Sequence, residues 1–310
     1  MFGAQVGAEG AGVPVVLVCP NVYGLRGTGQ PPIGSGWGAA RGPLGRARDA
    51  AFFRLMERMF DSGLPALNAA RAAHGLGPNA HTLDQVRGRP TVVLMAPEFD
   101  FPAEFPPYVH HGGAQLDDPA WTEPWTPPPG DDPLVLVAMS STFQNQVPDL
   151  QRVAAALGTL PVRGVITAGP ALDLAGFEAP ANVQVVASAP HSEVLRHAAA
   201  VVTHGGHGTV VKALAADVPL LVMPMGRDQG DNAARVVAHG AGLRLKRSAK
   251  PVAIAREVGR LLDEPSFGAE AARLGVAIRA SAGPAVAVRE IEAAASASSP
   301  NVEPEVAASR

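Results

Sequence analysis

Two short polar loops in the C-terminal third of the chain hold the residues best suited to chemistry. The first, HGGHGT from His204 to Thr209, follows an apolar run and precedes a helical pattern. The glycines Gly205, Gly206 and Gly208 leave the first backbone N–H groups of that helix open, and such amides bind anions. His204 and Thr209 add an imidazole N–H and a hydroxyl. The loop predicts a diphosphate site without a P-loop lysine, although tight packing is an alternative reason for its glycines.

The second polar loop, Gly226–Asp231, lies about one strand and one helix further along the chain. The apolar runs that precede the two loops are Ala199–Thr203 and Pro219–Met223, and the segments Thr209–Ala216 and Asp231–His239 are helical in pattern. Apolar runs that alternate with helices are typical of βαβ units and a parallel sheet. Because ligands bind at the carboxyl ends of such strands, we expect both loops in one site.

The composition argues against several classes of protein. With 310 residues, 47% hydrophobic and 17% charged, the chain can bury two cores, which favours two domains. Its net charge of −3 lacks the excess of positive charge that is typical of nucleic-acid-binding proteins. The one cysteine, Cys19, lies in an apolar run, which favours a core position over a disulfide or a cysteine-based metal site. Without a spanning apolar run or a signal peptide, we expect a cytoplasmic protein that has no transmembrane segment.

The remaining patterns predict the elements that position these loops. Met1–Gly12 shows no pattern, and Pro20–Gly45 is a long Gly/Pro loop in which Tyr23 and Trp37 either line an acceptor pocket or pack the loop. The predicted strands are Val13–Cys19, Thr91–Ala96, Tyr108–Gly113, Leu134–Met139, Val162–Thr167, Val183–Val186 and Leu243–Leu245. The predicted helices are Ala47–Phe60, Leu64–His74, Val147–Leu157, Ser192–His197, Pro251–Leu262, Phe267–Ala280 and Pro284–Ala295.

Five segments of the C-terminal half carry a resemblance to a known family. They resemble the donor signature of nucleotide-sugar-dependent glycosyltransferases of the GT-B fold, in particular the bacterial antibiotic and macrolide type related to UDP-glucuronosyl and plant UDP-glycosyltransferases. The resemblance implies an α/β fold with two Rossmann-like domains. The matching segments are SAPHSEVL (Ser188–Leu195), THGGHGT (Thr203–Thr209), VPLLVMP (Val218–Pro224), DQGDNAARV (Asp228–Val236) and GAG (Gly240–Gly242).

The resemblance assigns the donor to residues of the two loops. His204, together with the backbone and hydroxyl of Gly208 and Thr209, is expected to hold the nucleotide diphosphate that becomes the leaving group. Stabilising this charge is transition-state electrostatics. Asp228 and Gln229 match the pair that hydrogen-bonds the hydroxyls of the transferred sugar.

Further donor contacts are expected from two other post-strand loops. Ala189 and its neighbours match the segment whose backbone reads the edge of the base. For His191 two interpretations stay open, contact with the base or the start of a helix. Ser141 and Thr142 resemble the loop that faces the diphosphate from the opposite side, although two hydroxyls in a loop also suit a helix cap.

Three positions depart from the family pattern. Ser188 stands where plant members keep a tryptophan that stacks on uracil, so no base stacking is supplied there. Lys212 replaces a glutamate that binds the ribose in many members, and instead offers a cation to a phosphate. Asp217 replaces a glycine after the helix, and an aspartate tolerates the left-handed conformation of that position.

The resemblance and the composition together predict four segments. Residues 1–114 form an N-terminal Rossmann-like domain on the acceptor side, and the Pro-rich stretch 115–133 is an interdomain linker with Trp121 and Trp125 packed on a domain face. Residues 134–295 form the nucleotide-sugar-binding domain, with a last helix that crosses back toward the first domain. Residues 296–310 are a flexible tail.

The N-terminal domain is expected to be truncated at its N-terminus. Family members take the acceptor proton with a histidine after their first strand, and none of the nine histidines here lies in that context. We therefore expect the acceptor base upstream of Met1, and assign no catalytic residue within the chain. Losing a general base costs about 100- to 10,000-fold in rate.

No cofactor and no metal are expected. His110 and His111 are adjacent residues of a predicted strand, so their side chains point to opposite faces. No D-x-D motif accompanies them, and the family generally needs no divalent ion. The nucleotide sugar is a substrate rather than a cofactor.

The leading hypothesis is a glycosyltransferase of natural-product glycosylation. It would transfer a hexose with inversion from a UDP- or dTDP-sugar to a small hydrophobic acceptor. The alternative is a non-catalytic nucleotide-sugar-binding remnant that lacks the acceptor base. A UDP-sugar epimerase on the same fold is disfavoured, because the sequence shows no further acidic residues near the diphosphate loop.

Overall fold

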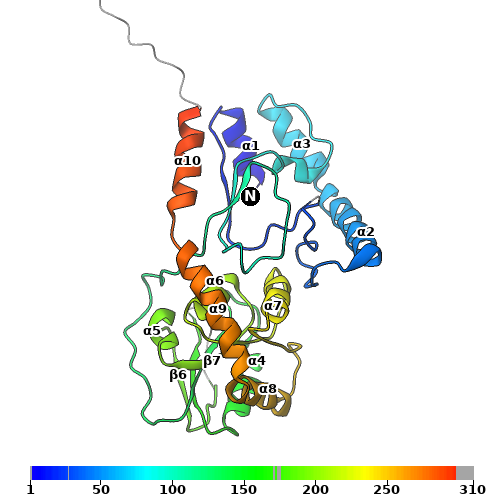
Figure 1. Cartoon of the computed structure of the whole chain (residues 1–310). Helices are drawn as coiled ribbons and strands as arrows, with labels where there is room; N and C mark the ends of the chain where they lie inside the picture. The colour runs from blue at the N-terminus through cyan, green and yellow to red at the C-terminus, as the bar shows by residue number, and fades with distance from the viewer. Residues whose placement is uncertain (1, 27, 170–171, 173–175, 298–310) are drawn as a thin grey trace, which may run out of the picture.

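An N-terminal and a C-terminal lobe, each built on a parallel sheet, make up the chain (Figure 1). The computed structural model describes residues 2–26, 28–169, 172 and 176–297. The N-terminal lobe contains α1 (Phe2–Gly10), β1 (Leu17–Cys19), α2 (Gly42–Asp61), α3 (Leu64–Ala73), the 3₁₀ helix η1 (Thr82–Gln85), β2 (Thr91–Val93) and β3 (Val109–His111). Its three strands pair in the order β1-β2-β3.

The C-terminal lobe is a doubly covered sheet of six parallel strands. Their order is β6-β5-β4-β7-β8-β9, with every neighbouring pair parallel. The strands are β4 (Leu134–Ala138), β5 (Arg163–Thr167), β6 (Val183–Val186), β7 (Ala198–Thr203), β8 (Leu220–Val222) and β9 (Gly242–Arg244). The helices are α4 (Val147–Leu157), α5 (His191–Leu195), α6 (His207–Ala215), α7 (Gln229–Ala238), α8 (Pro251–Asp263), α9 (Pro265–Ser281) and α10 (Ala285–Ala297).

The apolar runs form strands because both faces of this sheet are buried. On β4, Leu134, Leu136 and Ala138 belong to one hydrophobic cluster, whereas Val135 and Val137 belong to another on the opposite face. This two-residue alternation with no polar face is what a parallel sheet covered by helices requires. The register keeps the carboxyl ends of the strands level, so the loops after them meet at one edge.

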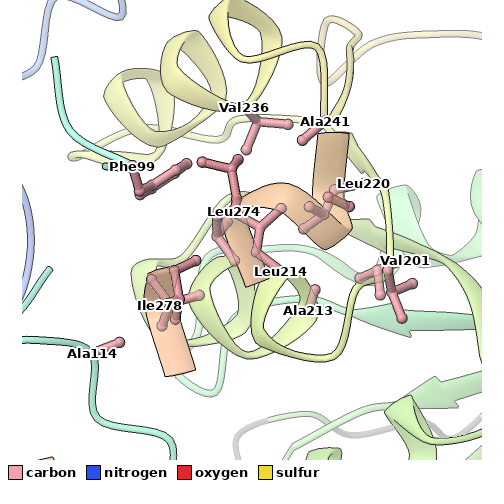
Figure 2. Close-up of a cluster of buried hydrophobic side chains, with 14 of the residues drawn as sticks. Phe99, Ala114, Val201, Ala213, Leu214, Leu220, Val236, Ala241, Leu274 and Ile278 are labelled. Atoms are coloured by element: carbon pink, nitrogen blue, oxygen red, sulfur yellow. The ribbon is translucent and has the colours of Figure 1, made fainter. Parts of the chain in front are cut away.

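One of these clusters continues from the C-terminal lobe into the N-terminal lobe. Phe99 and Ala114 of the N-terminal lobe join Leu274 and Ile278 of α9 in the same buried cluster (Figure 2). All four side chains have almost no exposed surface. The lobes therefore share apolar contacts, and their mutual placement is set partly by hydrophobic burial.

The predicted α/β pattern is confirmed for the elements of the C-terminal lobe, with shifts of a few residues at their ends. The sequence of Met1–Gly12 shows no pattern, yet Phe2–Gly10 forms a helix, α1, which packs against α3. Glu9 of α1 pairs with Arg71 and Arg89, and these contacts, with burial opposing them, lower the pKa of Glu9 to about 2. Tertiary contact, rather than helical propensity in this Gly-rich segment, accounts for the helix.

The last helix crosses back to the N-terminal lobe, as the resemblance implies. In Figure 1, α10 runs beside the upper lobe, beyond the end of α9. His110 Nε2 lies 3.7 Å from a carboxylate oxygen of Glu290 on α10. Between the two helices, the Gly283 N–H donates to the Ala114 carbonyl over 3.1 Å. The predicted domain boundaries stay predictions, and residues 298–310 of the predicted tail lie outside the described residues.

The long Gly/Pro loop after β1 packs against both lobes. Tyr23 is buried edge-on against Phe105, and Trp37 packs on Phe52 with the Arg48 guanidinium over its ring. Of the two interpretations of these aromatic residues, the structure therefore favours loop packing.

Helix α7 connects this loop to the C-terminal lobe. The carboxylate of Asp231 accepts hydrogen bonds from the N–H groups of Gly34 and Gly36, at 2.6 and 2.7 Å. Both glycines have positive φ, 79° and 63°, a conformation that a side chain disfavours. One and two turns further along α7, Arg235 and His239 contact the N-terminal lobe as well.

A buried ion pair joins the two lobes. Arg235 lies 2.8 Å from Asp100, and both side chains are almost fully buried. Asp100 also accepts a hydrogen bond from the Phe101 N–H over 2.8 Å and lies 3.1 Å from His111 Nε2. Burial works to raise the pKa of Asp100, but the bond to His111 and the charge of Arg235 outweigh it and hold the pKa below its ordinary value.

Within the described residues, no helix combines the length and the apolar character needed to cross a membrane.

We expect Arg235→Met to lower the free energy of unfolding by about 3–5 kcal/mol, because Asp100 stays buried without its guanidinium partner. Urea denaturation measures the change. Arg273→Met is the matched control, since Arg273 is 54% exposed and pairs with Glu270 on the same helix; its expected effect is below about 1 kcal/mol. Equal effects of the two substitutions would show that the buried pair does not stabilise the chain.

Candidate functional site

A cleft of about 380 Å³ opens at the carboxyl edge of the six-stranded sheet. Its walls are the loops after β4, β5, β6, β7 and β8, together with the first part of the segment that joins the lobes. A cleft therefore lies at the sheet edge where the two polar loops meet, and its role as the donor site stays a prediction. Ten of the eleven predicted site residues line it: Ser141, Thr142, Ala189, His191, His204, Gly206, Gly208, Thr209, Asp228 and Gln229.

The amino end of α6 faces this cleft. Gly206 caps the helix without a side-chain hydrogen bond, and the first intrahelical acceptor is its carbonyl, which receives the Val210 N–H over 3.1 Å. In the described part of the chain, the N–H groups of His207, Gly208 and Thr209 have no acceptor. A helix start of this kind carries a partial positive charge, worth roughly 0.3–1 kcal/mol for one anionic group. The geometry suits an anion.

His204 lies at the base of the cleft, directly after β7. It is 7% exposed, and its Nδ1 lies 3.4 Å from the Thr203 hydroxyl oxygen. Burial lowers the pKa of His204 to about 4, and contact with the Ala138 backbone offsets only part of that effect. At neutral pH the ring is uncharged, so it can offer one N–H donor rather than a positive charge.

The glycines of the first loop differ in what they do. A Cβ on Gly206 would lie 2.7 Å from Cε1 and Nε2 of His204, so the imidazole lies directly against this residue. Gly208 has open space where a Cβ would be. Gly206 therefore makes room for the His204 ring, whereas Gly208 leaves the approach to the helix amides clear.

Gly205 is the one predicted site residue that does not line the cleft. Its φ is +93°, and a Cβ would lie 2.7 Å from Val222 and 2.9 Å from the Gln229 carbonyl oxygen. Its N–H donates to the Thr203 hydroxyl over 3.2 Å. The packing explanation considered for the glycines therefore holds for this one, and its part in anion binding stays a prediction.

The second loop is hydrogen-bonded to the first. Asn232 Nδ2, fully buried on α7, donates to the Gly205 carbonyl over 2.9 Å and to the Asp228 carboxylate over 3.2 Å. This orients Asp228, half-buried in the cleft wall. The N–H groups of Met225 and Gly226 donate to the Gln229 side-chain oxygen, at 2.7 and 3.1 Å.

Gln144, which the sequence analysis did not assign to the site, links the loop after β4 to the second loop. Gln229 Nε2 donates to the Gln144 side-chain oxygen over 3.1 Å, and Gln144 Nε2 donates to Ser140 Oγ over 2.7 Å. Gln229 thus keeps one amide N–H for a ligand. Ser141 and Thr142 lie exposed in the same loop, with the Thr142 hydroxyl 3.0 Å from Ser140 Oγ.

His191 begins α5, so the helix-start interpretation is confirmed; it also lines the cleft, and its contact with the base stays a prediction. Its Nε2 lies 3.2 Å from the Thr167 hydroxyl oxygen, and burial lowers its pKa, with the charge of Lys212 acting in the same direction. Ala189, two residues earlier, is buried with only 3% of its surface exposed in the wall.

The sequence analysis missed the contribution of the linker. Asp118 lines the cleft and pairs with Lys212 of α6, with 2.7 Å between Oδ1 and Nζ. Trp121 and Arg227 also line the cleft. Lys212 is therefore held by a carboxylate, which counts against a free cation for phosphate. The sequence signal for this pair is weak: the Pro-rich segment carries an acidic residue, Asp118, whose charge is opposite to that of Lys212.

The histidines of β3 have separate partners. His111 contacts Asp100, whereas His110 lies near Glu290 on the other side of the strand. The prediction that they point to opposite faces is confirmed. Among the described residues, no group of three or more metal-ligating side chains is arranged to hold an ion.

Asp217 has φ +63°, so the predicted left-handed conformation after α6 is confirmed. His239 follows the end of α7 and faces the N-terminal lobe. Its Nε2 lies 3.1 Å from the Phe99 carbonyl oxygen, and burial lowers its pKa, which favours the uncharged ring.

Comparisons with known proteins agree with this architecture. Residues 153–294 match the family described as erythromycin biosynthesis protein CIII-like, C-terminal domain. The chain is 32% identical over 287 residues to 4'-demethylrebeccamycin synthase of Lentzea aerocolonigenes, which covers 88% of the chain and 67% of that protein. It is 36% identical over 202 residues to aklavinone 7-beta-L-rhodosaminyltransferase of Streptomyces galilaeus, with coverage of 63% and 45%.

A solved structure has the same arrangement of lobes. CalG4, the calicheamicin glycosyltransferase, superposes with a TM-score of 0.71 at 25% identity, covering 96% of this chain and 71% of CalG4. The predicted fold, GT-B with two Rossmann-like domains, is confirmed by this likeness. The chain spans only part of the length of each of these relatives.

The lowered pKa of the buried His204 predicts how the stability of the chain depends on pH. In the unfolded chain this histidine binds a proton below about pH 6.5. In the folded chain it binds one only near its lowered pKa of about 4. The free energy of unfolding therefore falls as the pH drops from about 6.5 toward 4. We expect the parent to lose more stability between pH 7 and pH 5 than His204→Asn does, measured by thermal denaturation. His74→Asn, which changes an exposed histidine, is the matched control. An identical pH dependence in His204→Asn and the parent would contradict the assignment of a neutral ring.

Proposed function

We propose that this chain, which belongs to the GT-B glycosyltransferases of antibiotic biosynthesis with an erythromycin biosynthesis protein CIII-like C-terminal domain, transfers a hexose with inversion. The donor is a UDP- or dTDP-sugar, and the acceptor is a small hydrophobic molecule. Family membership supports the class of reaction. The nucleotide, the sugar, the acceptor and the stereochemistry belong to the proposal.

The observation that carries the proposal is the free amino end of α6 in the cleft. In such a transfer, the bond between the sugar and the diphosphate breaks, and negative charge develops on the diphosphate. The N–H groups of His207, Gly208 and Thr209 are preorganised donors for that charge, and His204 adds a neutral donor beside them. Donors fixed before the reaction stabilise the transition state without reorganising.

Asp228 and Gln229 suit the hydroxyls of the transferred sugar. Asp228 lies in the wall with its carboxylate oriented by Asn232, and Gln229 is held by loop amides with one N–H left over. A carboxylate accepts from hydroxyl groups and an amide N–H donates to them, so the pair can recognise a polyol. Fixed partners of this kind position a substrate with little loss of side-chain entropy.

Transfer also requires a group that takes the proton of the incoming hydroxyl. Burial lowers the pKa of His191, His204 and His207, so these cleft histidines are weak bases. We assign none of the described residues as the catalytic base. This observation keeps the alternative, a nucleotide-sugar-binding chain without transfer activity, as the second candidate.

Nucleotide binding tests the donor site. We expect UDP or dTDP to bind in isothermal titration, and His204→Ala to weaken binding by about 10-fold or more, since a hydrogen bond to a charged group contributes about 1.5–3 kcal/mol. His204→Asn, which keeps an N–H donor, is expected to retain more affinity. The proposal fails when the parent binds neither nucleotide.

Turnover separates the two candidates. We expect hydrolysis or transfer from a UDP- or dTDP-sugar to continue in EDTA, because the proposal assigns the diphosphate charge to helix amides rather than to a divalent ion. Release of UDP or dTDP measures the reaction. Binding without release would support the non-catalytic alternative, and loss of activity in EDTA would overturn the metal-independent mechanism.

A further inference from the structure

Trp121 is an exposed aromatic residue in the wall of the cleft. It belongs to the linker between the lobes, and 52% of its surface is accessible although it lines the cleft. Trp125, four residues later, is docked instead: its Nε1 donates to Gln184 Oε1 over 3.1 Å and its ring packs near His197. The linker thus packs one tryptophan, half-buried, on the C-terminal lobe and presents the other to the cleft.

The linker is fastened to the C-terminal lobe on both sides of Trp121. Before it, Asp118 pairs with Lys212 at 2.7 Å and accepts the Ser192 N–H over 3.1 Å. After it, the Glu123 N–H donates to Ser188 Oγ over 3.1 Å. A turn between these anchors, closed by the Thr122 N–H and the Pro119 carbonyl at 3.1 Å, carries Trp121. The position of the indole is therefore set by the C-terminal lobe.

Few other aromatic rings line the cleft near Trp121. Its further aromatic lining residues among the described ones are three histidines. His204 and His207 lie at the amino end of α6, where the anion is expected, and His191 faces the Thr167 hydroxyl. Ser188, hydrogen-bonded to the linker, has no ring. Trp121 is thus the large aromatic face next to the 188–191 loop.

We infer that Trp121 stacks on the nucleobase of the donor, so that the linker forms part of the nucleotide site. The inference rests on the proposed function. Every base has an apolar π face, and an indole provides a large partner for it. With the diphosphate at α6, the base would lie toward the loop 187–191 and the linker, where this indole stands. Stacking also accounts for an exposed tryptophan in a concave wall.

Titration with three ligands tests the inference. Trp121→Leu keeps apolar bulk but removes the aromatic face, and we expect it to weaken UDP and dTDP binding by roughly 5- to 150-fold. Binding of inorganic pyrophosphate, which has no base, is expected to stay within about 2-fold of the parent. Trp121→Phe is expected to retain most of the nucleotide affinity. Trp37→Leu, which removes a tryptophan outside the cleft, is the matched control and leaves all three affinities unchanged.

Tryptophan fluorescence supplies a second readout. We expect UDP or dTDP to quench the emission of the parent and of Trp37→Phe, but not that of Trp121→Phe, because a stacked base quenches the indole that it contacts. Thermal denaturation confirms that each variant is folded.

The outcomes distinguish this inference from the proposed function. No nucleotide binding by the parent would overturn both. Equal nucleotide affinity in Trp121→Leu and the parent would overturn the stacking role alone. Equal weakening of nucleotide and pyrophosphate binding would show that Trp121 supports the shape of the cleft, and would also overturn it.

Discussion

The buried ion pair between Asp100 and Arg235 is the interaction on which the arrangement of the lobes depends. It places one charge from each lobe where the side chains are almost fully buried, and a buried charge is costly without an opposite charge beside it. Arg235 lies on α7, the helix that begins at the cleft with Asp228 and Gln229. A helix is stiff over ten residues, so fixing its middle against the N-terminal lobe also fixes its first turn. The hydrogen bonds from Asn232 then extend this order to the loop that precedes α6.

The segment DQGDNAARV therefore both lines the cleft and contacts the N-terminal lobe. The resemblance assigned it only to donor binding. Its first two residues face the cleft. Asp231 and Arg235 of this segment, and His239 just after the end of α7, recur every four residues and contact the glycine loop, Asp100 and the Phe99 carbonyl of the other lobe. Helical spacing allows one short segment to present both sets of side chains. A motif recognised for binding can thus owe part of its sequence to the contact between lobes.

The fold was largely predictable from the sequence because strands buried on both faces leave long apolar runs, as in β4 and β7. The short α1 was missed because its Gly-rich sequence has little helical preference and depends on contacts from Arg71 and Arg89. The glycines of the first loop all looked alike in sequence, yet Gly205 is needed for packing and Gly206 for the His204 ring. Gln144 and Asp118 could not be assigned, because a polar residue in a loop acquires its neighbours only through the tertiary fold.

The anchoring of the linker has a consequence for exchanging parts between related chains. A chimera of two related chains can be joined within the connection between the lobes. Here Asp118 and Glu123 are hydrogen-bonded to Lys212 and Ser188, so this part of the connection belongs structurally to the wall of the C-terminal lobe. A junction placed after Glu123 would import a foreign wall together with a foreign N-terminal lobe, whereas one placed before Asp118 would keep the wall and its partners in the same parent.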